Sequence, residues 1–228
     1  MRLARPAIDI GLSTHVIAPM LAFWRDDAGL TFDHLLPIRR GHDQHRFAAA
    51  GSVVKINHHA DPLPPAAPSG YRELVVARAG LDAPRALVDP DGNRLRLVPP
   101  GEEGVGQIGV CLAVRDLAAH RRFYADALGL AEEPHARGAA FRAGESLILL
   151  EESADAPAEA GMAGPGWRYI TLQVFKVDEE HARILALGYR EALAPLTLGA
   201  TARISMIRDP DGNWIELSQR ASIVGSLE

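Results

Sequence analysis

The sequence has almost no cysteine. Cys111 is the only one among 228 residues, which excludes an internal disulfide and any cysteine-rich metal cluster. Its neighbours in the run IGVCLAV are apolar, so we expect Cys111 to be a core residue. The absence of disulfides fits a reducing compartment, and the N-terminus lacks the apolar run and cleavage site of a signal peptide. Both observations predict a cytoplasmic protein.

An excess of positive charge and long apolar stretches are also missing. The formal net charge of −5 provides no basic field for nucleic acid or for an anionic membrane. No stretch approaches the roughly 20 apolar residues of a membrane span. Hydrophobic residues make up 47% of the chain and charged residues 23%, which is typical of a globular protein. We therefore expect neither a nucleic-acid partner nor a membrane.

An internal repeat organises the chain. The motif DPDGN at residues 89–93, followed by RLRLV, returns at residues 209–213, followed by WIELS. Proline presets φ, and aspartate and glycine tolerate tight turns, so each copy predicts a turn that leads into a strand. Residues 8–30 also match residues 107–130 when Phe23-Trp24 is aligned with Phe123-Tyr124. Each of these segments predicts a short apolar strand and an amphipathic helix that ends at glycine.

The repeat predicts two unequal halves. The N-terminal half has no counterpart of residues 178–199, which read as a helix and a following strand or loop. The segment PPGEEGVG contains proline, glycine and charge without apolar periodicity, as expected of a linker. The predicted organisation is therefore an abbreviated domain (residues 1–98), a linker (99–106), a complete domain (107–221) and a tail (222–228).

Three motifs in the second half resemble a known family. LAVRDLAAHRRFYADALGL, YITLQVFKVDEEHARILALG and DPDGNWIEL together look like a domain of the vicinal oxygen chelate superfamily of glyoxalases, bleomycin-resistance proteins and extradiol dioxygenases. The resemblance covers residues 107–219. It implies an α+β fold in which paired βαβββ modules form curved mixed sheets, with two tandem domains here, the N-terminal one abbreviated. In that family a cup between the modules holds a small molecule, usually against a divalent metal.

The resemblance also implies positions for a site. Metal-dependent members carry His, Gln or Glu on the first strand of each module and Glu on the last. In the C-terminal half Glu216 matches a last-strand position, but the first-strand positions fall on Gly109 and Tyr169. In the N-terminal half Asp9 takes a first-strand position and Arg96 a last-strand position. Arg96 suits a substrate carboxylate or phosphate, or it pairs with a nearby carboxylate such as Asp9.

The histidines of the N-terminal half are candidate ligands for a metal. Six of the nine lie in the first 60 residues. His34, His45 and His58 lie on strands that are neighbours in the family fold, where they could converge with Asp9. These four residues are the candidate ligands for iron, manganese, nickel or zinc, and the alternative is a protein that works without a metal.

Other polar residues are candidates for binding a substrate. Tyr169 and Gln173 share one face of a strand by the two-residue period, and this face either orients a ligand oxygen, with Arg203 opposing its charge, or is simply exposed. Lys55 stands where the family often has a ligand Glu, and it either holds an anionic group or is a solvated edge lysine. Glu216 would act as a general base without metal if burial raised its pKa.

The resemblance leads to two functional hypotheses. The first is an enzyme that acts on a small oxygenated organic substrate as an isomerase, lyase or ring-cleaving oxygenase, with Glu216 and Tyr169 as its catalytic residues. The second is a non-catalytic binding or resistance protein of the bleomycin-resistance type. Either would be a monomer or a homodimer with a small-molecule ligand.

Overall fold

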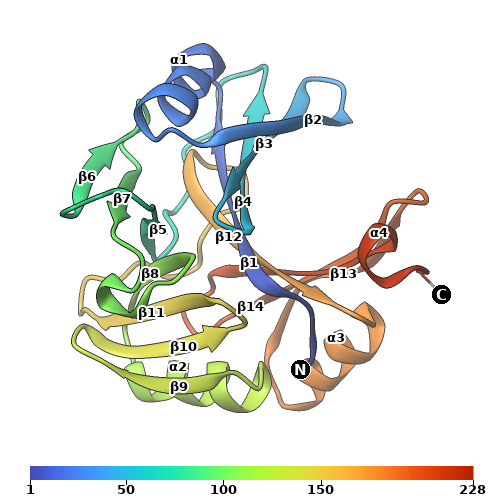
Figure 1. Cartoon of the computed structure of the whole chain (residues 1–228). Helices are drawn as coiled ribbons and strands as arrows, with labels where there is room; N and C mark the ends of the chain where they lie inside the picture. The colour runs from blue at the N-terminus through green and yellow to red at the C-terminus, as the bar shows by residue number, and fades with distance from the viewer. Residues whose placement is uncertain (228) are drawn as a thin grey trace.

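The computed structural model of the chain describes residues 1–227, and its strands form two curved sheets (Figure 1). The eight-stranded sheet runs, in spatial order, β13 (Arg190–Leu198), β14 (Ala202–Arg208), β15 (Trp214–Arg220), β12 (Gly166–Val174), β1 (Leu3–Thr14), β4 (Ser52–His59), β3 (His42–Ala49) and β2 (Thr31–Arg39). The seven-stranded sheet runs β6 (Arg85–Val88), β7 (Arg94–Val98), β5 (Tyr71–Ala77), β8 (Ile108–Val114), β11 (Ser146–Glu152), β10 (Gly138–Ala143) and β9 (Ala131–His135).

Short helices join the strands into modules. The helices are α1 (Ile17–Ala22), α2 (Leu117–Arg122), α3 (Val177–Ala186) and the terminal α4 (Ala221–Val224); α1 and α2 each continue into a π-helical turn, at Phe23–Asp27 and Phe123–Ala127. A complete module consists of a strand, a helix and three strands; within residues 1–227 the second module, β5 to β7, is the only one that lacks the helix, and it also lacks one strand. The predicted α+β fold of paired modules is confirmed. Within residues 1–227 no helix is long and apolar enough to cross a lipid bilayer.

The two sheets divide the chain differently from the predicted halves. The eight-stranded sheet joins the first module to the last through antiparallel pairing of β1 with β12, and the seven-stranded sheet joins the second to the third through β5 and β8. In Figure 1 the blue β1 accordingly lies beside the orange β12. Residues 60–70 and 153–165 carry the chain from one sheet to the other, whereas residues 99–106 connect two strands of the same sheet. Each sheet therefore contains strands from both sides of the predicted linker.

The repeated motifs form the features that their residues predict. In the second DPDGN copy, Asp209 Oδ1 accepts a hydrogen bond of 2.8 Å from the backbone N–H of Asn213, and Gly212 adopts a φ of 84°. Asn213 Oδ1 also accepts a bond of 2.6 Å from the N–H of Gly70, which ties the first crossover to the eight-stranded sheet. The aromatic pairs at the ends of α1 and α2 are buried, with Trp24 and Phe123 both 0% exposed.

Candidate functional site

A cavity of about 480 Å³ lies on the face of the eight-stranded sheet that points away from the core. Its volume is within the range of small-molecule sites. The first module lines it with β1 to β4, and the last module with β12 to β15. Its polar lining consists of Ser13, Arg39, His42, Gln44, Arg46, Lys55, Asn57, His59, Tyr169, Thr201, Glu216, Ser218 and Arg220.

The two-residue period of strands puts these side chains on one face. In β3 and β4 the cross-strand partners are Gln44 with Asn57 and Arg46 with Lys55, and all four line the cavity. The alternate residues point the other way, and Phe47, for example, is a buried core residue. Alternation of polar and apolar residues therefore builds a polar floor over an apolar core.

Lys55 lies at the centre of this floor. Its Nζ donates a hydrogen bond of 2.6 Å to Oγ1 of Thr171 and lies 3.4 Å from Oε2 of Glu216. The Lys55 side chain is only 5% exposed and that of Glu216 12%. Burial lowers the pKa of Lys55, while the neighbouring Glu216 carboxylate opposes this shift. The structure thus brings together two residues that the sequence placed in different halves.

Tyr169 lies beside Lys55, whose Nζ is 5.3 Å from the centre of the tyrosine ring. The Tyr169 hydroxyl accepts hydrogen bonds from Nδ2 of Asn57 (3.3 Å) and Nε2 of Gln44 (3.4 Å). Burial, reinforced by the charge of Glu216, raises the pKa of Tyr169, so the phenol keeps its proton at physiological pH. Because the oxygen accepts from both amides, its proton is free to be donated to a group in the cavity.

The other two substrate-binding candidates of the C-terminal half do not line the cavity. Arg203 points to the opposite side of β14, where its Nη2 donates to Oδ1 of Asp178 in α3 at 2.6 Å. Gln173 is buried at 2% exposure opposite Ser218, outside the cavity lining. The strand alternation that puts Ala202 in the cavity is what turns Arg203 away from it.

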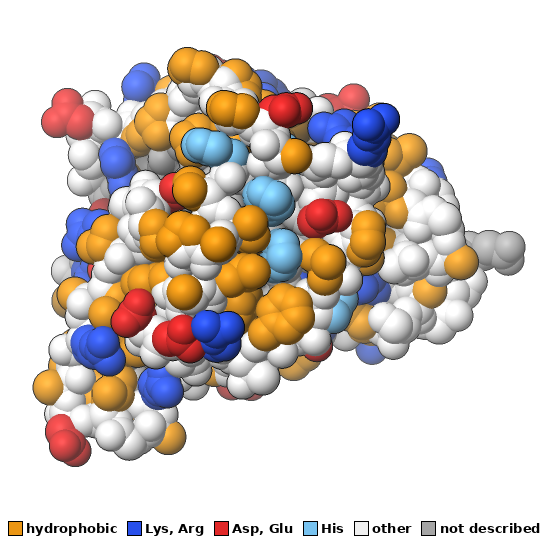
Figure 2. Space-filling model, turned by 90° about the horizontal axis from the view of Figure 1, so that it is seen from above, with side chains coloured by type: hydrophobic (Ala, Val, Ile, Leu, Met, Phe, Trp, Pro, Cys, Tyr) orange, Lys and Arg blue, Asp and Glu red, His pale blue; other side chains and the backbone are white. Residues whose placement is uncertain are grey.

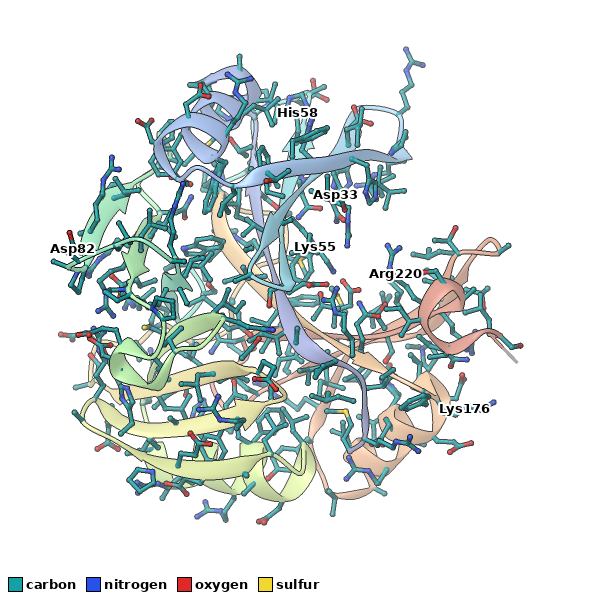
Figure 3. The ribbon with its side chains drawn as sticks, in the orientation of Figure 1. Asp33, Lys55, His58, Asp82, Lys176 and Arg220 are labelled. Carbon is teal, nitrogen blue, oxygen red and sulfur yellow. The ribbon has the colours of Figure 1, made fainter. Side chains whose placement is uncertain are left out.

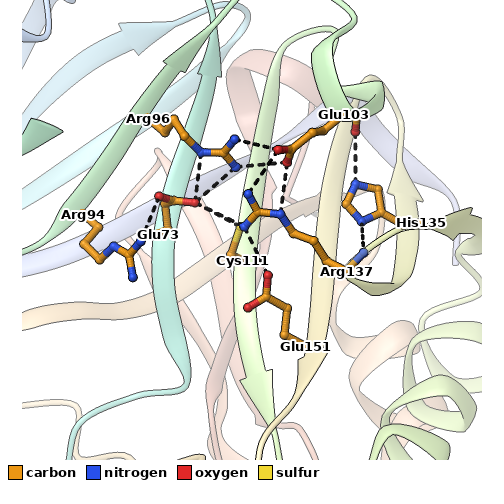
Figure 4. A network of polar contacts seen from close by, with 8 residues as sticks. All are labelled: Glu73, Arg94, Arg96, Glu103, Cys111, His135, Arg137 and Glu151. Atoms are coloured by element: carbon orange, nitrogen blue, oxygen red, sulfur yellow. Dashed lines mark hydrogen bonds and ion pairs between the residues drawn. The ribbon is translucent and has the colours of Figure 1, made fainter. Parts of the chain in front are cut away.

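Arg96 belongs to a different network, on the seven-stranded sheet (Figure 4). It donates to Glu103 at 2.7 Å and to Glu73 at 3.3 Å, and Arg137 also contacts Glu103, at 3.1 Å. Val105 is fully buried beneath this network. The predicted linker therefore covers the face of the seven-stranded sheet that corresponds to the cavity, and Arg96 binds the carboxylates of Glu73 and Glu103 rather than that of Asp9.

The four candidate metal ligands do not converge. Asp9 is fully buried, accepts a hydrogen bond of 2.9 Å from Val53 N and forms an ion pair with Arg5. His45 and His58 lie on the side of the sheet away from the cavity, with ring centres 6.3 Å apart. His34 is exposed and contacts Asp33 at 2.9 Å. Histidines do gather among hydrophobic side chains on one surface (Figure 2), but residues 1–227 contain no group of three or more His, Cys, Asp or Glu suited to a metal.

The donors in the cavity do not fit a divalent metal either. Lys55 occupies the last-strand position that the family often fills with a ligand Glu, and it lies between Thr171 and Glu216. A protonated ammonium has no lone pair for a metal and repels one electrostatically. Among residues 1–227, Glu216 is the only carboxylate that lines the cavity. Lys55 and Glu216 therefore form an ion pair in the cavity and not the ligand set of a metal.

Several cavity residues were not among the candidates drawn from the sequence. They include Gln44, Arg46 and Arg220, and a pair of histidines, His42 and His59, whose rings stack at 4.2 Å. Burial lowers the pKa of both histidines, so they are neutral at physiological pH. The sequence contains a pattern that could have identified the β3 residues, since positions 42, 44 and 46 of HDQHRF are polar and their two-residue spacing places them on one face of a strand.

Comparisons with known proteins agree with this architecture. The structure is similar to that of glyoxalase I from Zea mays, with 14% identity and a TM-score of 0.72 over 96% of this chain and 95% of that one. It is also similar to a putative dioxygenase from Bacillus subtilis, with 13% identity and a TM-score of 0.70 over 95% of this chain and 86% of that one. At these identities the likeness concerns the fold alone.

Sequence comparison gives the family. None of the curated proteins compared with the chain matches it. The model of the Glyoxalase/Bleomycin resistance protein/Dioxygenase superfamily matches residues 104–217, which is half of the chain and includes the third module and most of the fourth. The chain belongs to this superfamily.

Proposed function

We propose that this chain is an isomerase or lyase that acts on a small oxygenated organic molecule in the cavity of the eight-stranded sheet, by proton transfer and without a metal. The observation that carries the proposal is the convergence of three groups, the carboxylate of Glu216, the ammonium of Lys55 and the phenol of Tyr169, on one cavity. A base and two electrophilic groups at one site form the usual constellation for removing a proton next to a carbonyl.

The proposed step uses each of these groups in one role. Glu216 takes a proton from the carbon next to the substrate carbonyl, and the C–H electrons form a carbon–carbon double bond as the carbonyl oxygen gains negative charge. Tyr169 donates a hydrogen bond to that oxygen and Lys55 stabilises its charge. In a 2-hydroxy carbonyl compound, return of the proton to the former carbonyl carbon, with transfer of the hydroxyl proton to the former carbonyl oxygen, completes an isomerisation. Departure of a leaving group, with its electron pair, from the carbon β to the carbonyl completes an elimination instead.

A second candidate function, non-catalytic binding, is favoured by the apolar part of the lining. Leu36 and Ile38 from β2 and Leu193 and Leu198 from β13 border the cavity, and such walls suit a hydrophobic ligand that is held without reaction. The two functions differ in one respect, since only the enzyme exchanges a carbon-bound proton.

Proton exchange in D₂O, followed by NMR, separates the two functions. A panel of 2-oxo acids, 2-hydroxy ketones and thioesters would be incubated with the protein. We expect exchange of the proton next to the carbonyl for at least one compound, and a loss of about 10²–10⁴-fold in Glu216→Gln. Arg203→Gln, which alters a residue on the opposite face, is the control and should exchange at the wild-type rate.

Two outcomes would count against the enzyme. If Glu216→Gln exchanged as fast as the wild type, the base would be another residue. If the wild type bound a compound of the panel but exchanged no proton of any compound, the non-catalytic function would be supported instead.

A further inference from the structure

Positive charge exceeds negative charge at the cavity. Four cations line it, Arg39, Arg46, Lys55 and Arg220, against the single carboxylate of Glu216. Glu216 pairs with Lys55. Within residues 1–227, neither Arg46 nor Arg220 forms an ion pair with a carboxylate, and the carboxylates of Asp9 and Glu216 attract Arg46 only from beyond ion-pair distance.

Arg46 is the least expected of these cations, because it is only 5% exposed. Its Nη1 donates to Oε1 of Gln44 at 2.8 Å, and its Nε has no hydrogen-bond partner within residues 1–227. It also lies directly across the strand ladder from Lys55. Like charges opposite each other destabilise a sheet, and a buried charge without a counter-ion is costly. A bound anion would relieve both costs.

Arg220 reaches the same space from the other module. It is the last residue of β15 and lines the cavity, and Figure 3 shows Lys55 and Arg220 at the opening between the two ends of the eight-stranded sheet. Burial, and then the positive charge of Arg220, lower the pKa of Arg46. The two guanidinium groups therefore come from the first and the last module toward one site.

We infer that the molecule bound here is an organic anion whose carboxylate or phosphate lies between Arg46 and Arg220 and whose remainder is apolar. Guanidinium groups bind both kinds of anion through paired N–H donors. The apolar remainder would contact the walls of Leu36, Ile38, Leu193 and Leu198. This inference rests on the proposed function only in placing the ligand in the same cavity, since the anion would bind with or without a reaction.

Three probes with one phenyl ring test the inference, benzoate, phenyl phosphate and the neutral benzyl alcohol. Their Kd values for the full-length chain would be measured by isothermal titration calorimetry. We expect at least one anion to bind about tenfold or more tightly than benzyl alcohol, and the tighter of the two anions identifies the preferred head group. Arg46→Gln and Arg220→Gln should each weaken anion binding at least about tenfold, the usual effect of losing one charged hydrogen bond, and Arg203→Gln should not change it.

The ligand-free variants provide a second readout. Because Arg46 faces Lys55 without a counter-anion, we expect Arg46→Met to leave the melting temperature unchanged or to raise it, and to abolish the rise that the bound anion causes in the wild type. Equal binding of benzyl alcohol and the anions, wild-type anion binding by Arg46→Gln and Arg220→Gln, or no binding of either anion would each overturn the inference.

The same variants separate this inference from the proposed function. Glu216→Gln should keep anion binding, since it removes only a negative charge near the site. If proton exchange depends on Glu216 but anion binding is unchanged in Arg46→Gln and Arg220→Gln, the inferred anion site is refuted and the proposed function is not. If anion binding depends on both arginines but no compound exchanges a proton, the proposed function is refuted and the inferred anion site is not.

Discussion

Lys55 Nζ lies 3.4 Å from Oε2 of Glu216, although 161 positions separate the two residues along the chain. The pair joins β4 of the first module to β15 of the last. It lies in a site with little solvent, where a charge that loses its partner is strongly disfavoured. The pair therefore links the stability of the fold to the chemistry of the site.

The first prediction concerns this pair. Lys55→Met leaves the largely buried Glu216 carboxylate unpaired and should lower the free energy of unfolding by about 1–3 kcal/mol. The double variant Lys55→Met/Glu216→Gln removes both charges and should recover part of that loss. Urea unfolding of the wild type, both single variants and the double variant gives the coupling energy, and strictly additive effects would contradict an ionic interaction.

The second prediction concerns the space that Tyr169 occupies. Gly11 of β1 is the register partner of Tyr169, and a Cβ at Gly11 would lie 2.3 Å from Cε1 of the tyrosine ring. Gly11→Ala should therefore displace Tyr169, lower the free energy of unfolding by about 1–3 kcal/mol and reduce proton exchange. Gly106→Ala is a matched control, because its Cβ would meet no atom within 4 Å. Wild-type stability and exchange in Gly11→Ala would show that the ring has room to move.

The third prediction concerns acid stability. Hydrogen bonds from Arg96, and then from Arg137, lower the pKa of Glu103 from 4.5 to about 2. A carboxyl group with a lowered pKa stabilises the fold above its unfolded-state pKa, and this contribution is lost as the pH falls from about 4.5 to about 2. Glu103→Gln should therefore be less stable than the wild type at neutral pH and show a flatter pH dependence in that range.

The exposed neighbour Glu102 serves as its control, because within residues 1–227 it forms no ion pair. Unfolding free energies of Glu102→Gln and Glu103→Gln measured between neutral and acid pH make the comparison. Parallel curves for Glu103→Gln and the wild type would show that the network on the seven-stranded sheet does not hold this carboxylate.

The fourth prediction concerns the single thiol. Burial, and next the charge of Glu73, raises the pKa of Cys111 from 9.0 to about 12. Because the thiolate is the reactive form, the native protein should resist alkylation by iodoacetamide at neutral pH and react after unfolding in urea. The folded state binds the thiol proton more tightly than the unfolded state, so stability should fall as the pH rises from about 9 to about 12. Cys111→Ala should lose that part of the slope, and rapid alkylation of the native thiol would contradict the prediction.

Local features of the fold were predictable from the sequence because they depend on neighbouring residues. The turns at residues 89–93 and 209–213, and the missing helix of the second module, follow from short motifs and from the spacing of the repeat. The partner of each module was not predictable, because β1 and β8 both begin a module and both contain a run of buried residues. Strand patterning determines which face is buried, not which strand lies alongside.

The candidate site was predictable only in part, for the same reason. Lys55, Tyr169 and Glu216 were each identified from their position on a strand, but the sequence assigned Lys55 to one half and the other two residues to another. Arg96 matched Glu216 in the repeat, yet it lies in the other sheet among carboxylates of its own chain. Only the pairing of the first and last modules identifies Arg46 as part of the site.

The pairing of modules has a consequence for how the protein is made. The strands of the seven-stranded sheet lie within one continuous segment, from Tyr71 to Glu152, whereas the eight-stranded sheet needs residues before His59 and after Gly166. During synthesis the seven-stranded sheet can form before the strands that pair with the first module, β12 to β15, have been made. The cavity is completed only when β15 and Arg220 have left the ribosome, so a chain that stops earlier lacks one side of the cavity.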